Sequence, residues 1–239
     1  MRGIILAGGT GSRLNPLTKT TNKHLLPIYD KQMIFYPIET LKKSGVKDIL
    51  IISGPGHAGQ FLELLGSGWD DGLNISYAIQ DKPKGIAHAI WVAKKFVKGE
   101  KLVVILGDNV LDADISDDIK NFKKGAKVFL KEVEDPQRYG VAEIKNEKII
   151  KIVEKPKNPK SNKAVIGVYL YDENVFDYIE NIAASARGEY EVTDLNNKYL
   201  EKGMLDHATV DGFWIDAGTF DGLLQASKEI KNGRNETKE

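Results

Sequence analysis

Residues 4–13 read IILAGGTGSR, and this stretch decides the architecture that we expect for the chain. Residues 4–7 form a short, wholly apolar run, which is typical of a strand buried on both faces of a sheet. Gly8, Gly9 and Gly11 follow at once and predict a tight turn, because glycine adopts backbone conformations that other residues avoid. A buried strand that runs into a glycine-rich turn predicts an α/β fold with a ligand site beside that turn.

Apolar runs and amphipathic segments alternate beyond this turn. Gly45 stands where a helix stop is expected, directly after a segment with Ile34, Ile38 and Leu41 on one face. Such alternation predicts a Rossmann-like, three-layer α/β fold with a mixed, mostly parallel central sheet and helices on both faces. In this part of the chain we expect strands at 46–53, 75–80 and 102–106, and helices at 33–44, 59–65 and 86–97.

The pattern changes after about residue 125, where strands follow one another with fewer helices between them. The expected strands cover 126–133, 140–144, 148–154 and 164–171, and helices return at 173–184, at 192–202 and from near Thr219. The residues from Asn232 onward are polar and are expected to be frayed. No repeat or low-complexity linker separates the two patterns, so residues 1–239 are interpreted as one domain.

The composition excludes several classes of protein. Lys and Arg total 34, as do Asp and Glu, and this balance argues against a nucleic-acid or anionic-membrane binder, which usually has a basic excess. The chain has no cysteine, which excludes a disulfide scaffold, a zinc–thiolate site, an iron–sulfur cluster and thiol catalysis. No apolar run approaches the roughly 20 residues that cross a bilayer, and the N-terminal apolar stretch is too short for a signal peptide. The sequence therefore predicts a soluble cytoplasmic protein.

The segment Gly8–Arg13 is a candidate phosphate-binding loop. Its backbone N–H groups can approach a phosphate without obstruction from Cβ atoms, and Arg13 adds a cation. The segment is no P-loop, because no Gly-Lys-Ser/Thr ends it, and Leu14 stands where the dinucleotide fingerprint has its third glycine. A plain glycine turn with a surface arginine is the alternative. Lys23, in NKHLLP at 22–27, is a candidate for phosphate binding only because it is near this loop.

Two acidic residues stand at the ends of predicted strands. Asp108 follows the strand at 102–106, and Asp216 lies in FWIDAGT at 213–219, before a helix. Acids in these positions point into the crevice where open α/β sheets bind ligands, and Mg²⁺ in phosphate chemistry takes one or two protein carboxylates. The pair is therefore a candidate Mg²⁺ site, with capping of the following turn as the alternative for Asp108. Glu154 ends another predicted strand, which indicates either the lip of a site or an ordinary strand end.

Taken together, these segments resemble the sugar-1-phosphate nucleotidylyltransferases, and most closely the members that act in dTDP-sugar synthesis. The chain is similar to the short form, without the C-terminal helical segment that longer members use for subunit contacts and regulation. The matching segments occur in the family's order: GIILAGGTGSRL (3–14), NKHLLP (22–27), VILGDN (104–109), DPQRYGV (135–141), EKP (154–156), AVIGVYLYD (164–172), RGEYEVTD (187–194) and WIDAGT (214–219).

The resemblance implies a nucleotide-binding part of about residues 1–125 and a sugar-phosphate-binding part of about residues 126–231. It assigns the triphosphate to Gly8, Gly9, Thr10, Gly11, Ser12, Arg13 and Lys23, and the base to Gln80 and Gly85. It assigns Mg²⁺ to Asp108 and Asp216. It assigns the sugar phosphate to Asn109, Tyr139, Gly140, Glu154, Lys155, Val165 and Arg187. His88 stands where many relatives carry Gln, and Ile166 where Thr is frequent, so we expect altered base contacts and an altered pocket wall. A homo-oligomer is also implied.

The implied activity is Mg²⁺-dependent transfer of a thymidylyl group from dTTP to α-D-glucose 1-phosphate. It yields dTDP-glucose and pyrophosphate, the first step towards dTDP-rhamnose and related deoxysugars. A sugar phosphate is anionic near neutral pH and needs no general base, which agrees with the absence of a Ser-His-Asp or Cys-His arrangement. Arg13, Lys23, Asp108 and Asp216 are the candidate catalytic residues.

Three alternatives differ in what they require. Uracil presents the same edge as thymine to Gln80. The nearest alternative function is therefore that of a UTP-dependent uridylyltransferase or of another sugar-1-phosphate nucleotidylyltransferase. A dinucleotide-dependent oxidoreductase needs an acid at a second strand end, whereas Asp30 lies in a Pro/Tyr loop. A non-catalytic nucleotide-sugar sensor would not need both Asp108 and Asp216.

Overall fold

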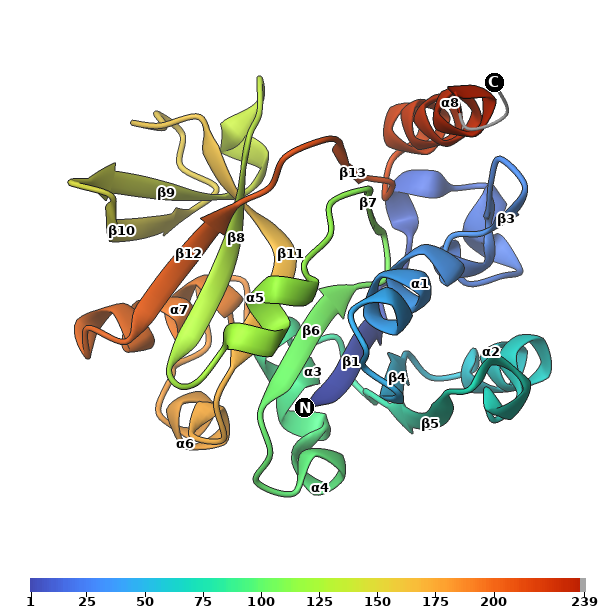
Figure 1. Ribbon diagram of the computed structural model, residues 1–239, viewed down its shortest axis with the longest axis horizontal. Coiled ribbons are helices and arrows are strands. Elements are labelled where there is room, and N and C mark those ends of the chain that lie inside the picture. The colour runs from blue at the N-terminus through green and yellow to red at the C-terminus, as the bar shows by residue number, and fades with distance from the viewer. Residues whose placement is uncertain (237–239) are drawn as a thin grey trace.

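A nine-stranded mixed sheet forms the centre of the computed structural model, which describes residues 1–236 (Figure 1). Its main path runs in the order β10-β9-β11-β6-β1-β4-β5, with β8 beside β11 and β12 beside β8. The buried run that begins the chain is β1 (Arg2–Ala7), and it pairs in parallel with both β4 (Asp48–Ser53) and β6 (Leu102–Leu106). β5 (Asn74–Ile79) extends this parallel half of the sheet. The glycine-rich turn therefore leaves the middle of a parallel sheet at its carboxyl edge.

The other half of the sheet is mostly antiparallel and grows from β11 (Lys163–Tyr171), which pairs antiparallel with β6. Because β11 is nine residues long, it pairs with β9 at Ala164 and Val165 and with β6 at Val168–Tyr171, and it pairs with β8 near both of its ends. The remaining strands are β8 (Ala126–Glu132), β9 (Gly140–Lys145), β10 (Lys148–Glu154) and β12 (Leu205–Thr209).

Helices cover both faces of the sheet, as the three-layer prediction requires. One apolar core lies under α3 (Ile86–Val92), α4 (Lys94–Val97), α6 (Val175–Glu180) and α7 (Val192–Glu201). The opposite core lies under α1 (Phe35–Lys43), α2 (Ala58–Leu65) and α5 (Ser116–Asn121). The predicted Rossmann-like α/β fold is thus confirmed.

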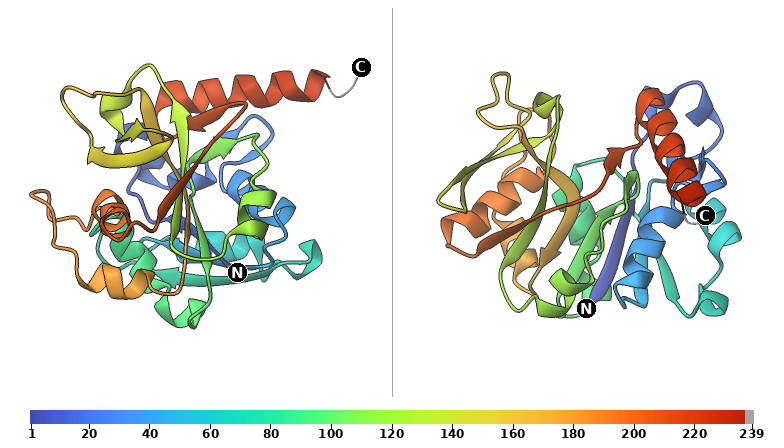
Figure 2. Two further views of the ribbon diagram at one scale, coloured as in Figure 1. Left: turned by 60° about the vertical axis from the view of Figure 1, so that its left-hand side comes forward. Right: turned by 45° about the horizontal axis from the view of Figure 1, so that its top comes forward.

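A third, smaller apolar cluster attaches α8 (Phe220–Glu236) to the body of the protein. It joins two short strand pairs, β2 (Pro27–Ile28) with β3 (Lys31–Gln32) and β7 (Asn109–Leu111) with β13 (Trp214–Asp216). Figure 2 shows α8 lying along this corner of the molecule. The pairing of β7 with β13 matters for the site, because it brings Asn109 opposite Asp216.

Several predicted boundaries of helices and strands differ from those in the structure. The helix expected at 86–97 is interrupted at Ala93 and forms α3 and α4. The helix expected at 173–184 covers only Val175–Glu180, and α5 and β12 were not expected at all. The residues from Asn232 to Glu236, expected to be frayed, continue α8, and Thr237–Glu239 lie outside the described residues. Among residues 1–236 no helix is long and apolar enough to span a membrane.

Candidate active site

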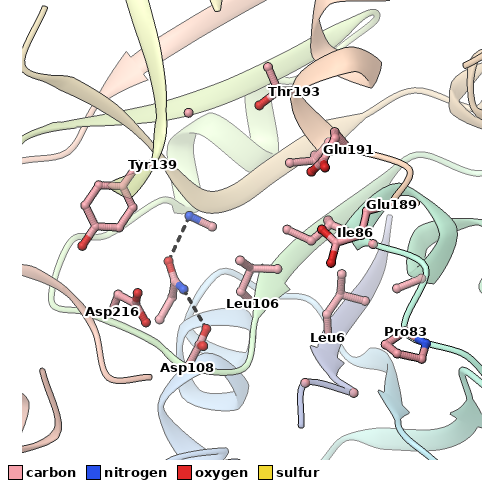
Figure 3. A pocket seen from close by; sticks show the side chains of 18 of the residues that line it. Leu6, Pro83, Ile86, Leu106, Asp108, Tyr139, Glu189, Glu191, Thr193 and Asp216 are labelled. Carbon is pink, nitrogen blue, oxygen red and sulfur yellow. Dashed lines mark hydrogen bonds between the residues drawn. The ribbon is translucent and has the colours of Figure 1, made fainter. Parts of the chain in front are cut away.

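A pocket of about 730 Å³ opens at the carboxyl edge of β1 and β6. Its floor includes Leu6, next to the last residue of β1, and Leu106, the last residue of β6. In Figure 3 Asp108, Asp216 and Tyr139 lie toward one side of it and Leu6, Pro83 and Ile86 toward the other. The pocket thus joins the glycine-rich turn to the antiparallel half of the sheet.

Most of the residues proposed from the sequence converge on this one pocket. Only Thr10 and Gly11 do not line it. Gly11 has a φ of +67°, and a Cβ there would lie 2.8 Å from the Thr18 methyl carbon, so it shapes the loop. The predicted residues that do line the pocket are Gly8, Gly9, Ser12, Arg13, Lys23, Gln80, Gly85, Asp108, Asn109, Tyr139, Gly140, Glu154, Lys155, Val165, Arg187 and Asp216.

Asp108 and Lys23 form a nearly buried ion pair at the base of the pocket. The Lys23 ammonium donates to Oδ2 of Asp108, and the two side chains are only 11% and 12% exposed. Burial alone would raise the pKa of the Asp108 carboxyl, but the Lys23 charge and the hydrogen bonds from Lys23 and Asn109 together outweigh burial and hold that pKa well below its ordinary value. Asp108 is therefore a permanent anion, and its other oxygen accepts from the Asn109 amide at 3.1 Å.

Asp216 lies close to Asp108 although more than 100 residues separate them in the chain. A Cβ placed on Gly218 would lie 2.8 Å from Oδ1 of Asp216 and 3.0 Å from Oδ2 of Asp108, so both carboxylates face one small space. The same point is 2.9 Å from a guanidinium nitrogen of Arg13, which lies 3.8 Å from Asp216. Burial, followed by the negative charge of Asp108, raises the pKa of Asp216 above its ordinary value.

This pair of carboxylates fits a hard divalent cation. Burial and the charge of Asp108 both disfavour the charged form of Asp216, and a bound cation would relieve the repulsion between the two carboxylates. Among residues 1–236 no cluster of three or more histidine, aspartate or glutamate side chains could enclose a metal by itself. The donor set therefore suits Mg²⁺, which usually takes one or two carboxylates and fills its other positions with water and substrate phosphate.

Asn109, which the resemblance assigns to the sugar, lines the pocket and is held by three hydrogen bonds. Its Oδ1 accepts from the Gly167 backbone N–H at 2.9 Å and from Nε1–H of Trp214 at 2.6 Å, and the side chain is buried. Together with the bond to Asp108, these contacts commit most of the amide to the pocket wall. A Cβ on Gly167 would lie only 2.7 Å from this oxygen, so glycine is required there. Asn109 therefore orients Asp108.

The base side of the pocket is formed by Gln80 and Gly85. Gln80 follows β5 and is 7% exposed, and its amide nitrogen lies 3.1 Å from the carbonyl oxygen of Gly85. Gly85 has a φ of +94°, and a Cβ there would lie 2.6 Å from the carbonyl oxygen of Tyr190, so no other residue fits. The Gly85 N–H donates to no group of residues 1–236. The unpaired N–H of Gly85 and the side-chain amide of Gln80 therefore lie next to each other on this side of the pocket.

The far side of the pocket carries a charged lip. Glu154 ends β10 and accepts from the Thr193 hydroxyl at 2.6 Å. Arg187 pairs with Glu191 at 2.9 Å and approaches Glu154 at 3.6 Å, while Lys155 lies 3.5 Å from Glu154. Both cations are about half exposed, so an incoming anion can reach them.

Among the pocket residues that were not site candidates in the sequence analysis, His24 and Trp214 have the most specific surroundings. His24 is fully buried, and burial, with the charge of Lys23, lowers its pKa to about 3, so it is neutral. Its Nδ1 lies 2.7 Å from Oδ1 of Asn22, whose amide nitrogen donates to the carbonyl oxygen of Ala7. The rings of Trp214 and Tyr139 pack in an edge-to-face arrangement, with their centres 5.3 Å apart. His24 and Trp214 lie in NKHLLP and WIDAGT, two of the segments that resemble the family. That resemblance was the signal from which they could have been proposed as site residues.

Comparisons with known proteins agree with this geometry. The nucleotidyl transferase family model matches residues 2–233. The glucose-1-phosphate thymidylyltransferase of Mycolicibacterium smegmatis is 43% identical over 97% of this chain and 82% of the relative. That of Xanthomonas campestris is 45% identical over 96% of this chain and 80% of the relative.

Solved structures extend the likeness to three dimensions. A Bacillus anthracis protein, provisionally assigned as a glucose-1-phosphate thymidylyltransferase and bound to a sucrose, is 51% identical with a TM-score of 0.91. The alignment covers 95% of this chain and 94% of that one. A UDP-glucose pyrophosphorylase complexed with UDP-glucose is 25% identical, with a TM-score of 0.84 over 97% and 98% of the two chains. The chain therefore belongs to the nucleotidyl transferase family.

Proposed function

We propose that the protein transfers a thymidylyl group from dTTP to glucose 1-phosphate and releases pyrophosphate. The observation that carries this proposal is the meeting of Asp108, Asp216, Lys23 and Arg13 in one pocket. Two carboxylates and two cations at one point suit phosphoryl transfer between polyanions, which depends on positioning and charge neutralisation. The names of the relatives support dTTP and glucose 1-phosphate as the substrates.

In the proposed reaction a phosphate oxygen of glucose 1-phosphate attacks the α-phosphorus of dTTP. A bond forms between that oxygen and the α-phosphorus, the bond to the bridging oxygen of the β-phosphate breaks, and pyrophosphate leaves with that electron pair. Arg13 and Lys23 bind the triphosphate, and Lys155 and Arg187 bind the sugar phosphate. Mg²⁺ bound to Asp108 and Asp216 would supply further positive charge at the transferring group.

No proton transfer is required of the protein in this step. The attacking oxygen is already anionic near neutral pH, and the buried His24 is held neutral with its Nδ1 beside Asn22. The chain's contribution is therefore to hold the two anions in line and exclude water from the apolar floor at Leu6 and Leu106. We assign residues of the first 125 positions to the nucleotide and most of the later pocket residues to the sugar phosphate.

The test is pyrophosphate release with Mg²⁺ and glucose 1-phosphate, run in parallel with dTTP, UTP, CTP and ATP. The proposal predicts the highest kcat/KM with dTTP. Equal turnover of UTP would keep the reaction and replace the thymidylyl assignment with the uridylyl alternative, which the UDP-glucose pyrophosphorylase structure favours. No release with any pair would indicate either a different sugar phosphate or the non-catalytic sensor, and would contradict the proposed reaction.

A further inference from the structure

The Gln80 amide at the base side of the pocket makes a hydrogen bond that the proposed reaction does not use. Its nitrogen Nε2 lies 3.0 Å from Nδ1 of His88, one helical turn along α3 from Gly85. The His88 ring is flanked by Trp91, with ring centres 6.4 Å apart, and by Tyr190 at 6.3 Å. The histidine is therefore held against the amide rather than turned to solvent.

The carbonyl of Gly85 determines which way the amide faces. A carbonyl oxygen can only accept, so the group 3.1 Å from it must be the NH₂ end of Gln80. One amide hydrogen is thereby taken, and the second points to His88. Since that contact also needs an acceptor, Nδ1 of His88 carries no proton and its hydrogen resides on Nε2.

The same arrangement leaves the oxygen of the Gln80 amide open. No group among residues 1–236 donates to Oε1, and the side chain lines the pocket. The oxygen faces the glycine-rich loop, since a Cβ on Gly8 would lie 3.3 Å from it. An acceptor fixed in this direction recognises a ring N–H, which the imide of thymine or uracil offers and N3 of cytosine does not.

We propose that His88 is a positioning residue for the nucleotide base: as a neutral Nδ1 acceptor it holds the Gln80 amide with Oε1 turned toward the base. This inference rests on the proposed nucleotide site. It predicts that His88 acts on dTTP affinity and on discrimination against CTP, and not on the transfer step, because the same contact exists before and during the reaction.

The proposal has a consequence for pH. A proton on Nδ1 would face the amide hydrogen of Gln80 that points to it and would break the contact. Burial, with the nearby Lys84 charge, lowers the pKa of His88 from its ordinary value, so the acceptor form predominates at neutral pH. The aromatic groups beside the ring are Trp91 and Tyr190, and Trp91 in turn bonds to Glu180, whose charge is paired with Lys94 at 2.7 Å. Affinity for dTTP should therefore fall as the pH drops through the lowered pKa of His88.

Two variants test the assignment. His88→Phe keeps a ring between Trp91 and Tyr190 but removes the acceptor, and His88→Gln restores an acceptor oxygen. For His88→Phe we expect KM and Kd for dTTP to rise about three- to tenfold, kcat to stay within about twofold, and the dTTP-over-CTP preference to shrink similarly. His88→Gln should recover the dTTP affinity and lose its dependence on pH between 5 and 8.

The tautomer provides a readout that needs no turnover. In ¹⁵N spectra of histidine-labelled protein, the His88 signal, assigned by its loss in His88→Phe, should show Nδ1 unprotonated and Nε2 protonated at pH 8. A proton on Nδ1, or unchanged dTTP affinity in His88→Phe, overturns the inference. If no nucleotide is turned over, the proposed function fails, while the tautomer and dTTP calorimetry still decide the role of His88.

Discussion

Replacement of Lys23 by methionine tests the buried ion pair on which the site is built. The Lys23→Met change leaves the Asp108 carboxylate about nine-tenths buried without its counterion. Removing one partner of a buried pair typically costs about 3–5 kcal/mol in the free energy of unfolding. For a chain of 239 residues this corresponds to a fall in Tm of about 6–10 °C.

Lys127→Met is the matched control. Lys127 on β8 pairs with Asp118 at 3.0 Å, but the acid is 27% exposed and the pair lies outside the pocket. A pair with this access to water is worth about 0–1 kcal/mol. In urea unfolding at pH 7, the free energy of unfolding of Lys23→Met should therefore be lower than that of Lys127→Met by at least about 2 kcal/mol.

The pH dependence identifies the cause of the loss. In the parent protein the pKa of folded Asp108 lies below its unfolded value, so the pair's contribution is complete at pH 7 and declines as the pH falls through the folded pKa. Without Lys23, burial raises that pKa, and protonation relieves the buried charge. The stability gap between parent and Lys23→Met should thus narrow between pH 7 and pH 4.5. A gap below about 1 kcal/mol, or one that does not change with pH, would refute the reasoning.

Three further substitutions give separate readouts. Asp108→Asn leaves the Lys23 ammonium without its buried counterion, so it should keep the fold but lose stability about as Lys23→Met does, and it should release pyrophosphate about 10²–10³-fold more slowly; near-parent turnover at saturating Mg²⁺ would contradict its role. Gly85→Ala, whose Cβ would meet the Tyr190 carbonyl oxygen at 2.6 Å, should lose about 2 kcal/mol or more in urea unfolding, whereas Gly59→Ala on α2, with open space around it, should lose none. Tyr199→Phe removes a donor to a buried carboxylate and should cost about 1–3 kcal/mol with kcat unchanged; equal Tm values would sink this prediction.

The parallel half of the fold was predictable because its strands are short apolar runs. The expected 102–106 strand coincides with Leu102–Leu106, and the run at 46–53 overlaps Asp48–Ser53. Burial on both faces makes such runs apolar throughout, so the sequence marks them strongly. Asp108 was found for the same reason, since it follows the clearest of these strands.

The parts that were missed depend on partners distant in the chain. β12 carries little apolar pattern, and its residues become a strand because β8 lies alongside. The hydrogen bonds of Asn109 to Trp214 and Gly167 likewise depend on β13 and β11 lying beside it, contacts that no local signal encodes. The neutral state of His24 follows from its burial, which spacing alone does not reveal.

The central claim is that a phosphate oxygen of the sugar phosphate becomes bonded to the α-phosphorus of the nucleotide. Glucose 1-phosphate labelled with ¹⁸O in its non-bridging phosphoryl oxygens tests this directly, with products resolved by ³¹P NMR and mass spectrometry. The account predicts dTDP-glucose that retains all of the label, with one labelled oxygen bridging the two phosphorus atoms, and unlabelled pyrophosphate. Label in pyrophosphate or in released phosphate would contradict it.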